Sequence, residues 1–173
     1  MPVPAAPTAA VLGQPARSQE QFNALAAQVA FALDPPFVFA WQQTGQSIAN
    51  GAVTPITMDS EVVDTDNVHS LVTNTSRLTI VTAGRYRVVG SILWNANATG
   101  YRTAKLLKNG VSFAITQTVA NGTQLSYMQV CDEIICVVGD YLELAGLQTS
   151  GGALTTGAGA DSTFIKARWA GIS

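Results

Sequence analysis

From residue 37 onward, apolar side chains recur with a period of two in short runs that Gly, Asn and Pro residues separate. The run from Tyr86 to Trp94 is the clearest case, since its alternate residues would share one face of a β-strand. Asn109-Gly110 and Asn121-Gly122 are dipeptides typical of tight type I′ hairpin turns. No alternation of strands and helices follows residue 36, so the sequence predicts an all-β, antiparallel sandwich or jelly roll.

The pattern predicts eight to ten strands. The clearest ranges are 37–41, 53–58, 78–81, 86–94, 101–107, 111–120, 125–138, 141–144 and 162–169. Pro55 interrupts the second of these ranges, which indicates an edge strand. The segment 59–75 is polar and is expected to form a loop, as is the Gly-flanked segment 151–159.

Residues 1–36 differ from the rest of the chain, so we divide it into a leading segment, 1–36, and a jelly-roll domain, 37–173. Residues 1–17 are rich in Pro and Ala and are expected to form an extended arm. Ser18 and Gln21 have the spacing of a capping box at the start of a helix. Asp34-Pro35-Pro36 ends that helix, because a residue that precedes Pro avoids the α region.

This short helix is amphipathic. Its apolar stripe consists of Phe22, Leu25, Val29 and Leu33. The stripe has two interpretations: the helix packs on its own domain, or arm and helix together dock onto a partner. The docking interpretation follows from the length of the helix, because a helix of about 15 residues is only marginally stable without a packing partner.

The composition excludes several classes of protein. Hydrophobic residues make up 47% of the chain and charged residues only 12%, which excludes an intrinsically disordered chain. The nine basic residues are scattered, so no nucleic-acid surface is predicted. No apolar run approaches the roughly 18 residues of a membrane span, and no basic start precedes an apolar stretch as in a secretory signal. Sparse charge is typical of surfaces that meet further copies of the same chain.

Cys131 and Cys136 are the two cysteines, and both fall in one expected strand. Residues five apart on a strand point to opposite faces and lie roughly 16 Å apart, too far for a disulfide. We therefore expect two free thiols and folding in a reducing compartment.

Four motifs share their order and spacing with one family of jelly rolls. They are Ala83-Gly84-Arg85-Tyr86-Arg87-Val88, Lys108-Asn109-Gly110, Gly139-Asp140-Tyr141-Leu142-Glu143-Leu144 and Ser162-Thr163-Phe164. Over residues 37–170 the chain resembles the complement globular-head and tumour-necrosis-factor domains. The resemblance implies a ten-stranded jelly roll that assembles as a homotrimer, without supplying a function by itself.

A narrower resemblance concerns two segments, 94–102 and 148–154, which are similar to segments of virion proteins of tailed bacteriophages, particularly those of actinobacteria. The arm and helix that end in Pro-Pro also resemble attachment segments of such proteins. This resemblance implies a virion protein assembled in the host cytoplasm, with residues 1–36 bound to other virion proteins and the head exposed to host glycans or proteins.

Six aromatic residues have two interpretations: they line a trimer interface, or they all fill the core of the sandwich. They are Phe39, Trp41, Tyr127, Tyr141, Phe164 and Trp169.

No catalytic, cofactor or metal site is predicted. His69 has Asp64 and Asp66 nearby, but no nucleophile elbow accompanies it. The run that begins at Asp64 resembles a calcium loop but has His69 where an EF-hand has Gly and Thr75 where it has Glu. A calcium ion on the loop 59–66 stays as an alternative to a solvated loop.

Three functions follow. The first is a trimeric structural protein of a phage capsid or tail, which stabilises the particle or adheres to the host. The second is a free-standing lectin-like or protein-binding module. The third is a tail-embedded hydrolase, for which the sequence offers no catalytic motif.

Overall fold

The computed structural model describes residue 3 and residues 18–172, and the arm expected at residues 1–17 otherwise lies outside them. Within the described part the chain forms one helix and twelve strands. In chain order they are α1 (Gln19–Leu33), β1 (Phe37–Trp41), β2 (Ser47–Ile48), β3 (Thr54–Pro55), β4 (Ser60–Asp64), β5 (Arg77–Thr79), β6 (Gly84–Trp94), β7 (Tyr101–Lys108), β8 (Val111–Val119), β9 (Ser126–Cys136), β10 (Tyr141–Gln148), β11 (Leu154–Gly157) and β12 (Phe164–Gly171).

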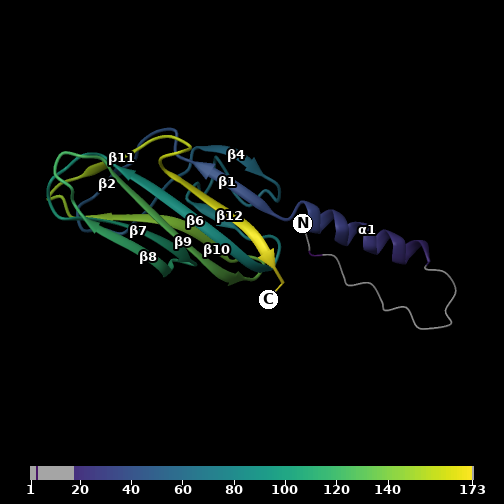
Figure 1. The fold of residues 1–173 in the computed structure, drawn as a ribbon. Coiled ribbons are helices and arrows are strands. Elements are labelled where there is room, and N and C mark those ends of the chain that lie inside the picture. The colour runs from purple at the N-terminus through teal and green to yellow at the C-terminus, as the bar shows by residue number, and fades with distance from the viewer. Residues whose placement is uncertain (1–2, 4–17, 173) are drawn as a thin grey trace.

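The strands form two antiparallel sheets that pack face to face (Figure 1). In the seven-stranded sheet, β6 pairs with β9 on one side and with β12 and β11 on the other, and β1 and β4 follow β12. In the five-stranded sheet, β10 and β7 are central and β8 is an edge strand. The predicted jelly-roll sandwich is confirmed; two of its strands, β2 and β3, have only two residues each.

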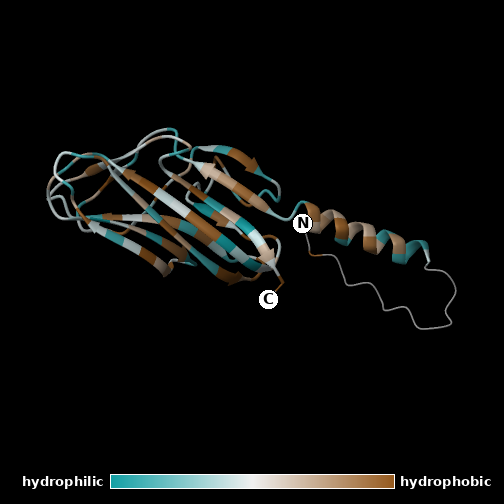
Figure 2. Ribbon diagram, viewed as in Figure 1, coloured by the Kyte–Doolittle hydropathy of each residue, from teal (hydrophilic) through white to brown (hydrophobic). Residues whose placement is uncertain are grey.

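The core lies between the two sheets and takes one face of each strand. In β6 the expected alternation is confirmed, since Tyr86, Val88, Ile92 and Trp94 are all buried while Arg85 and Arg87 point outward. Brown and teal segments alternate along these strands in Figure 2, as expected for strands with one buried face.

Two glycines let the sheets approach each other. A Cβ atom on Gly146 would lie 2.9 Å from the Trp94 ring, and one on Gly90 would lie 2.5 Å from Leu144. Larger residues at these positions would therefore separate strands that the core needs in contact.

Helix α1 begins as predicted. The Ser18 hydroxyl accepts a hydrogen bond from the Gln21 backbone N–H at 3.4 Å, and the Ser18 N–H donates to the Gln21 side chain at 3.1 Å. The helix projects from one end of the sandwich (Figure 1). Phe31 is the buried residue of the helix, and its ring packs edge-on against Trp169 at 4.8 Å between centroids.

Two segments expected as loops contain strands. The segment 59–75 includes β4, which pairs with β1, and the segment 151–159 includes β11, which pairs with β6 and β2. Both strands are short and polar or Gly-flanked, so their periodicity is weak and cross-strand pairing decides their conformation. Among the described residues, no helix is long and apolar enough to cross a bilayer.

Candidate functional site

One surface of the seven-stranded sheet faces away from the core and is built of aromatic and basic side chains. We define the outer face as the outward-pointing side chains of β1, β12 and β6. Strand pairing places them in rows: Trp41 beside Phe164 and Ser91; Phe39 beside Lys166 and Val89; Phe37 beside Arg168 and Arg87. The buried residues between them, Val38 and Ala40 in β1 and Ile165 and Ala167 in β12, hold this face outward.

Basic side chains lie over the aromatic rings of this face. The Lys166 Nζ atom is 3.9 Å from the centroid of the Phe39 ring and 4.6 Å from that of Phe164. The two rings meet edge to face at 5.6 Å, and Arg168 lies 5.9 Å from the Phe37 ring. A cation over a ring is attracted to its negative face, so the rings position these charges in the absence of a carboxylate.

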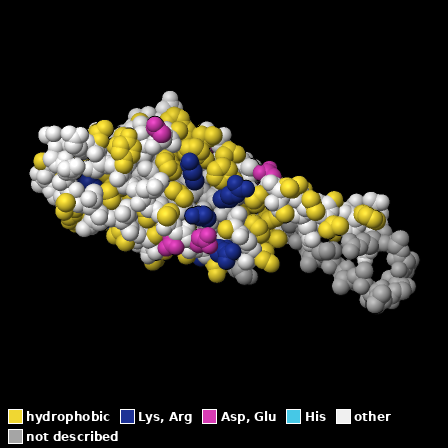
Figure 3. Space-filling model, viewed as in Figure 1, with side chains coloured by type: hydrophobic (Ala, Val, Ile, Leu, Met, Phe, Trp, Pro, Cys, Tyr) yellow, Lys and Arg dark blue, Asp and Glu magenta, His cyan; other side chains and the backbone are white. Residues whose placement is uncertain are grey.

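The outer face is strongly basic for a chain of net charge -2. It carries four of the nine basic residues of the chain: Arg85, Arg87, Lys166 and Arg168. Among the described residues only Arg85 of these four has an ion-pair partner, Glu133 on β9 at 3.4 Å. Figure 3 shows Lys and Arg side chains gathered beside hydrophobic ones on one side of the sandwich, with acidic side chains along one border.

A second surface lies where β8 and β9, each the edge strand of its sheet, run next to each other. We define the edge surface as the exposed side chains of these two strands. It carries Val111, Ile115 and Val119 from β8, each more than half exposed, and Asp132 and Glu133 from β9. β8 has no charged residue, so the charge of the edge surface comes from the two carboxylates. An exposed apolar edge strand is an open site for association with another chain.

The six aromatic residues predicted at an interface or in the core do not all fill the core. Trp169 alone packs against the core cluster, and its Nε1 donates to the Ala83 carbonyl at 3.1 Å. Phe39, Trp41 and Phe164 lie together on the outer face, where Phe164 is buried and the other two are half-buried. Tyr127 is exposed on β9, and Tyr141 lies on the other sheet with Arg77 at 4.1 Å over its ring.

The predicted helix stripe is largely uncovered. Phe22, Val29 and Leu33 are 56%, 48% and 78% exposed, and Leu25 is half-buried. The stripe therefore does not pack on the sandwich, and the helix attaches to it through Phe31, which lies outside the stripe. Sequence periodicity missed Phe31 because this residue lies on the opposite side of the helix from the stripe. Its partner, Trp169, is distant in sequence and is brought next to it only in the folded chain.

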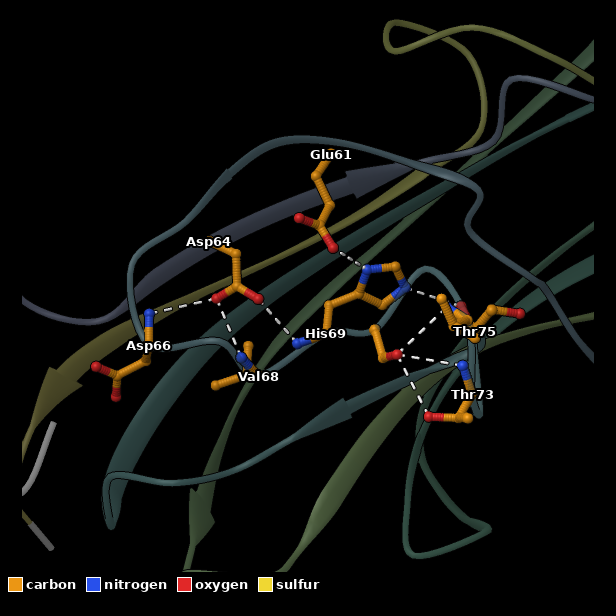
Figure 4. Close-up of polar contacts among 9 residues, drawn as sticks. Glu61, Asp64, Asp66, Val68, His69, Thr73 and Thr75 are labelled. Atoms are coloured by element: carbon orange, nitrogen blue, oxygen red, sulfur yellow. Dashed lines mark hydrogen bonds and ion pairs between the residues drawn. The ribbon is translucent and has the colours of Figure 1, made fainter.

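His69 is not in an exposed polar loop, as its neighbours suggested, but is buried (Figure 4). Its Nδ1 lies 2.6 Å from a Glu61 carboxylate oxygen, and its Nε2 lies 2.9 Å from the Thr75 carbonyl oxygen. Both ring nitrogens therefore have partners, and neither contacts a hydroxyl or thiol nucleophile. The side chain links β4 to the loop before β5 and has the geometry of a structural clip rather than of a catalytic base.

The acidic residues of this segment also shape the chain. The Asp64 carboxylate accepts backbone N–H groups from Asp66, Val68 and His69 at 2.9–3.3 Å (Figure 4). Asp59 accepts those of Gln43 and Thr44 in the same way. No group of three or more potential metal-ligating His, Cys, Asp or Glu side chains occurs in the described part of the chain.

The two cysteines lie on β9 and on its opposite faces, as predicted. Cys131 is exposed and Cys136 is buried. Burial raises the pKa of the Cys136 thiol to about 11, which makes it a poor nucleophile.

Sequence reasoning missed the four basic residues of the outer face. The signal was present in the run from Phe164 to Arg168, where Phe164, Lys166 and Arg168 alternate with buried residues. Their juxtaposition with Phe37 and Phe39 needed the pairing of β12 with β1, which joins the two ends of the domain.

Comparison with known proteins gives a fold. The sequence matches no protein-family model and no curated protein. Solved structures do match: the globular domain of zebrafish complement 1qA protein has a TM-score of 0.59 at 11% identity and covers 80% of this chain and 99% of that one. Murine APRIL has a TM-score of 0.61 at 9% identity, covering 78% and 98%. Eiger TNF from S. frugiperda has a TM-score of 0.62 at 13% identity, covering 80% and 95%. Residues 37–172 therefore form a jelly roll like those of the complement C1q and tumour-necrosis-factor proteins.

Proposed function

We propose that the protein is a non-enzymatic interaction protein that works as a closed homotrimer, in which the outer face of each copy packs against the edge surface of the next. The observation that carries this proposal is the stack of Lys166 on Phe39 and Phe164, an aromatic and basic cluster on the side of the sheet that faces away from the core.

The two surfaces complement each other. The outer face combines aromatic rings with four basic side chains, of which Arg85 already pairs with Glu133 of the same copy. The edge surface combines Asp132 with exposed aliphatic side chains. Two unlike surfaces on one molecule make a head-to-tail contact, which repeats until the ring closes. The resemblance to trimeric jelly rolls supports closure at three copies.

Helix α1 is proposed to attach the trimer to a larger assembly. Its stripe is exposed, it projects from the sandwich, and it carries Glu20 as its one charged residue. The similarity of segments 94–102 and 148–154 to phage virion proteins favours the virion of a tailed bacteriophage, formed in the host cytoplasm, as that assembly. In this location the jelly roll would stabilise the particle or contact the host surface.

A charge-swap experiment tests the trimer contact. Lys166→Glu should convert the trimer to monomer, because it places a carboxylate where the Asp132 carboxylate of the neighbouring copy approaches. Lys105→Glu is the matched control on the other sheet and should leave the mass unchanged. Adding Asp132→Lys to Lys166→Glu should restore assembly. A Lys166→Glu protein that remains trimeric would place the contact elsewhere.

A further inference from the structure

Four loops at the end of the sandwich away from α1 contain no ionisable side chain. They comprise residues 49–53, 95–100, 120–125 and 149–153, and we define them as the distal pole. Their exposed side chains are amides, hydroxyls and aliphatic groups, among them Val53 at 47% and Leu125 at 53% exposure, and this end is white and yellow in Figure 3. Charged residues make up 12% of the whole chain, and none of them falls in these loops.

Hydrogen bonds tie the four loops into one unit. The Gly51 N–H donates to the Gln148 carbonyl at 2.8 Å, and the Gly151 N–H to the Asn50 side chain at 2.8 Å. The Tyr101 N–H donates to the Thr149 hydroxyl at 2.9 Å. The fourth loop joins through the Ala120 N–H, which donates to the Gly100 carbonyl at 2.8 Å. A solvated loop needs no such cross-links, whereas a binding surface gains affinity from being ordered before its ligand arrives.

Arg102 supports the pole from inside. Its side chain is 1% exposed and donates to the carbonyl oxygens of Asn97, Thr99 and Tyr101, each at 3.0 Å. It has no carboxylate partner among the described residues. The guanidinium turns these carbonyls inward, which leaves the side chains of the 95–100 loop, such as Asn95 and Thr99, on the outside.

We propose that the distal pole binds a neutral carbohydrate, an oligosaccharide without carboxylate, sulfate or phosphate groups. Exposed amides and hydroxyls, here those of Asn95, Asn121, Thr123 and Gln124, donate and accept hydrogen bonds as sugar hydroxyls do. An acidic glycan would find no cation on these loops, whereas a neutral one requires no charge to be desolvated.

This assignment rests on the proposed interaction role, for which it names the ligand class, but not on the trimer itself. The full chain is applied to an array that carries neutral hexose and N-acetylhexosamine oligosaccharides together with sialylated and sulfated ones. We expect binding to neutral oligosaccharides that persists in 1 M NaCl. Binding confined to acidic glycans, or no binding, would overturn the assignment.

Variants locate the site. Asn95→Ala combined with Thr123→Ala should weaken binding of the best neutral oligosaccharide at least tenfold, whereas Thr79→Ala, an exposed threonine on β5, should leave it unchanged. Equal affinity for all three proteins would overturn the assignment. Light scattering on the same samples keeps the two proposals apart: a monomer that binds through the pole contradicts only the trimer, and a trimer that binds no neutral glycan contradicts only the pole.

Discussion

Asp140 is expected to be one of the most stabilising charged residues of the fold. Its carboxylate accepts hydrogen bonds from Lys108 Nζ at 2.9 Å, from the Asn109 side chain at 2.7 Å and from the Val137 N–H at 2.8 Å. The Lys108 ammonium is the main cause that lowers the pKa of Asp140 to about 2, and the two other donors act in the same direction against burial. These contacts join the Asn109-Gly110 turn to the start of β10.

The lowered pKa of Asp140 gives the size of its contribution to the free energy of unfolding. The carboxyl is about two units more acidic in the folded protein than its ordinary value of 3.8, and one unit corresponds to about 1.4 kcal/mol. Asp140 therefore contributes about 2 kcal/mol to the free energy of unfolding at pH 7. Because the folded-state pKa is the lower one, this contribution is complete above about pH 5 and is lost as the pH falls toward 2.

The assay is urea unfolding of wild type and Asp140→Asn at equal protein concentration between pH 2 and pH 7. The difference in unfolding free energy should be largest at pH 7 and should shrink by about 2 kcal/mol between pH 5 and pH 2. Asp161→Asn, an exposed carboxylate, should show no such trend. A difference between wild type and Asp140→Asn that is independent of pH would refute the reasoning, because it would mean that charge is not the source of the stability.

Three further predictions concern the rest of the molecule. Deleting residues 1–36 should leave a folded trimer, because α1 contacts the sandwich through one buried ring, that of Phe31. The truncated protein should no longer be incorporated into the particle. Unchanged incorporation would refute the anchor role, and aggregation would show that the helix covers a face of the core. Cys136 should resist alkylation at pH 8 until the protein unfolds, because burial keeps its thiol protonated. Cys131, which is exposed on β9, should be alkylated faster in the Lys166→Glu monomer than in the trimer. Equal alkylation rates for Cys131 in the two proteins would argue against an interface at β9. His69→Ala should lower the free energy of unfolding by about 1–3 kcal/mol, because the buried imidazole and its hydrogen bonds to Glu61 and Thr75 are lost. Glycan and particle binding should fall no further than this instability explains.

The long strands were predictable because one face of each is buried. In β9 the period of two holds over most of the strand, and in β6 it holds from Gly84 to Gly90, after which the residues up to Trp94 are all buried. Asn-Gly turns help to define where neighbouring strands end. The helix was predictable for the same reason, since the capping residues and the Pro pair that bound it act locally.

The rest depends on contacts between distant residues. The sequence of β4 predicts a loop because a charged residue such as Glu61 usually indicates an exposed position. In the fold Glu61 instead bonds to the buried His69. The outer face escaped prediction because Lys166 reads as an ordinary surface lysine until β12 is placed beside β1. The attachment of α1 through Phe31 likewise requires Trp169, which lies more than a hundred residues later.

The measurement that tests the central claim most directly is the mass of the full-length protein in solution, by native mass spectrometry or light scattering at micromolar concentration. The account predicts a single species of about 54 kDa, three times the 18.1 kDa chain. A stable 18.1 kDa monomer would contradict it, because the outer face and the edge surface would then stand exposed to water without a partner.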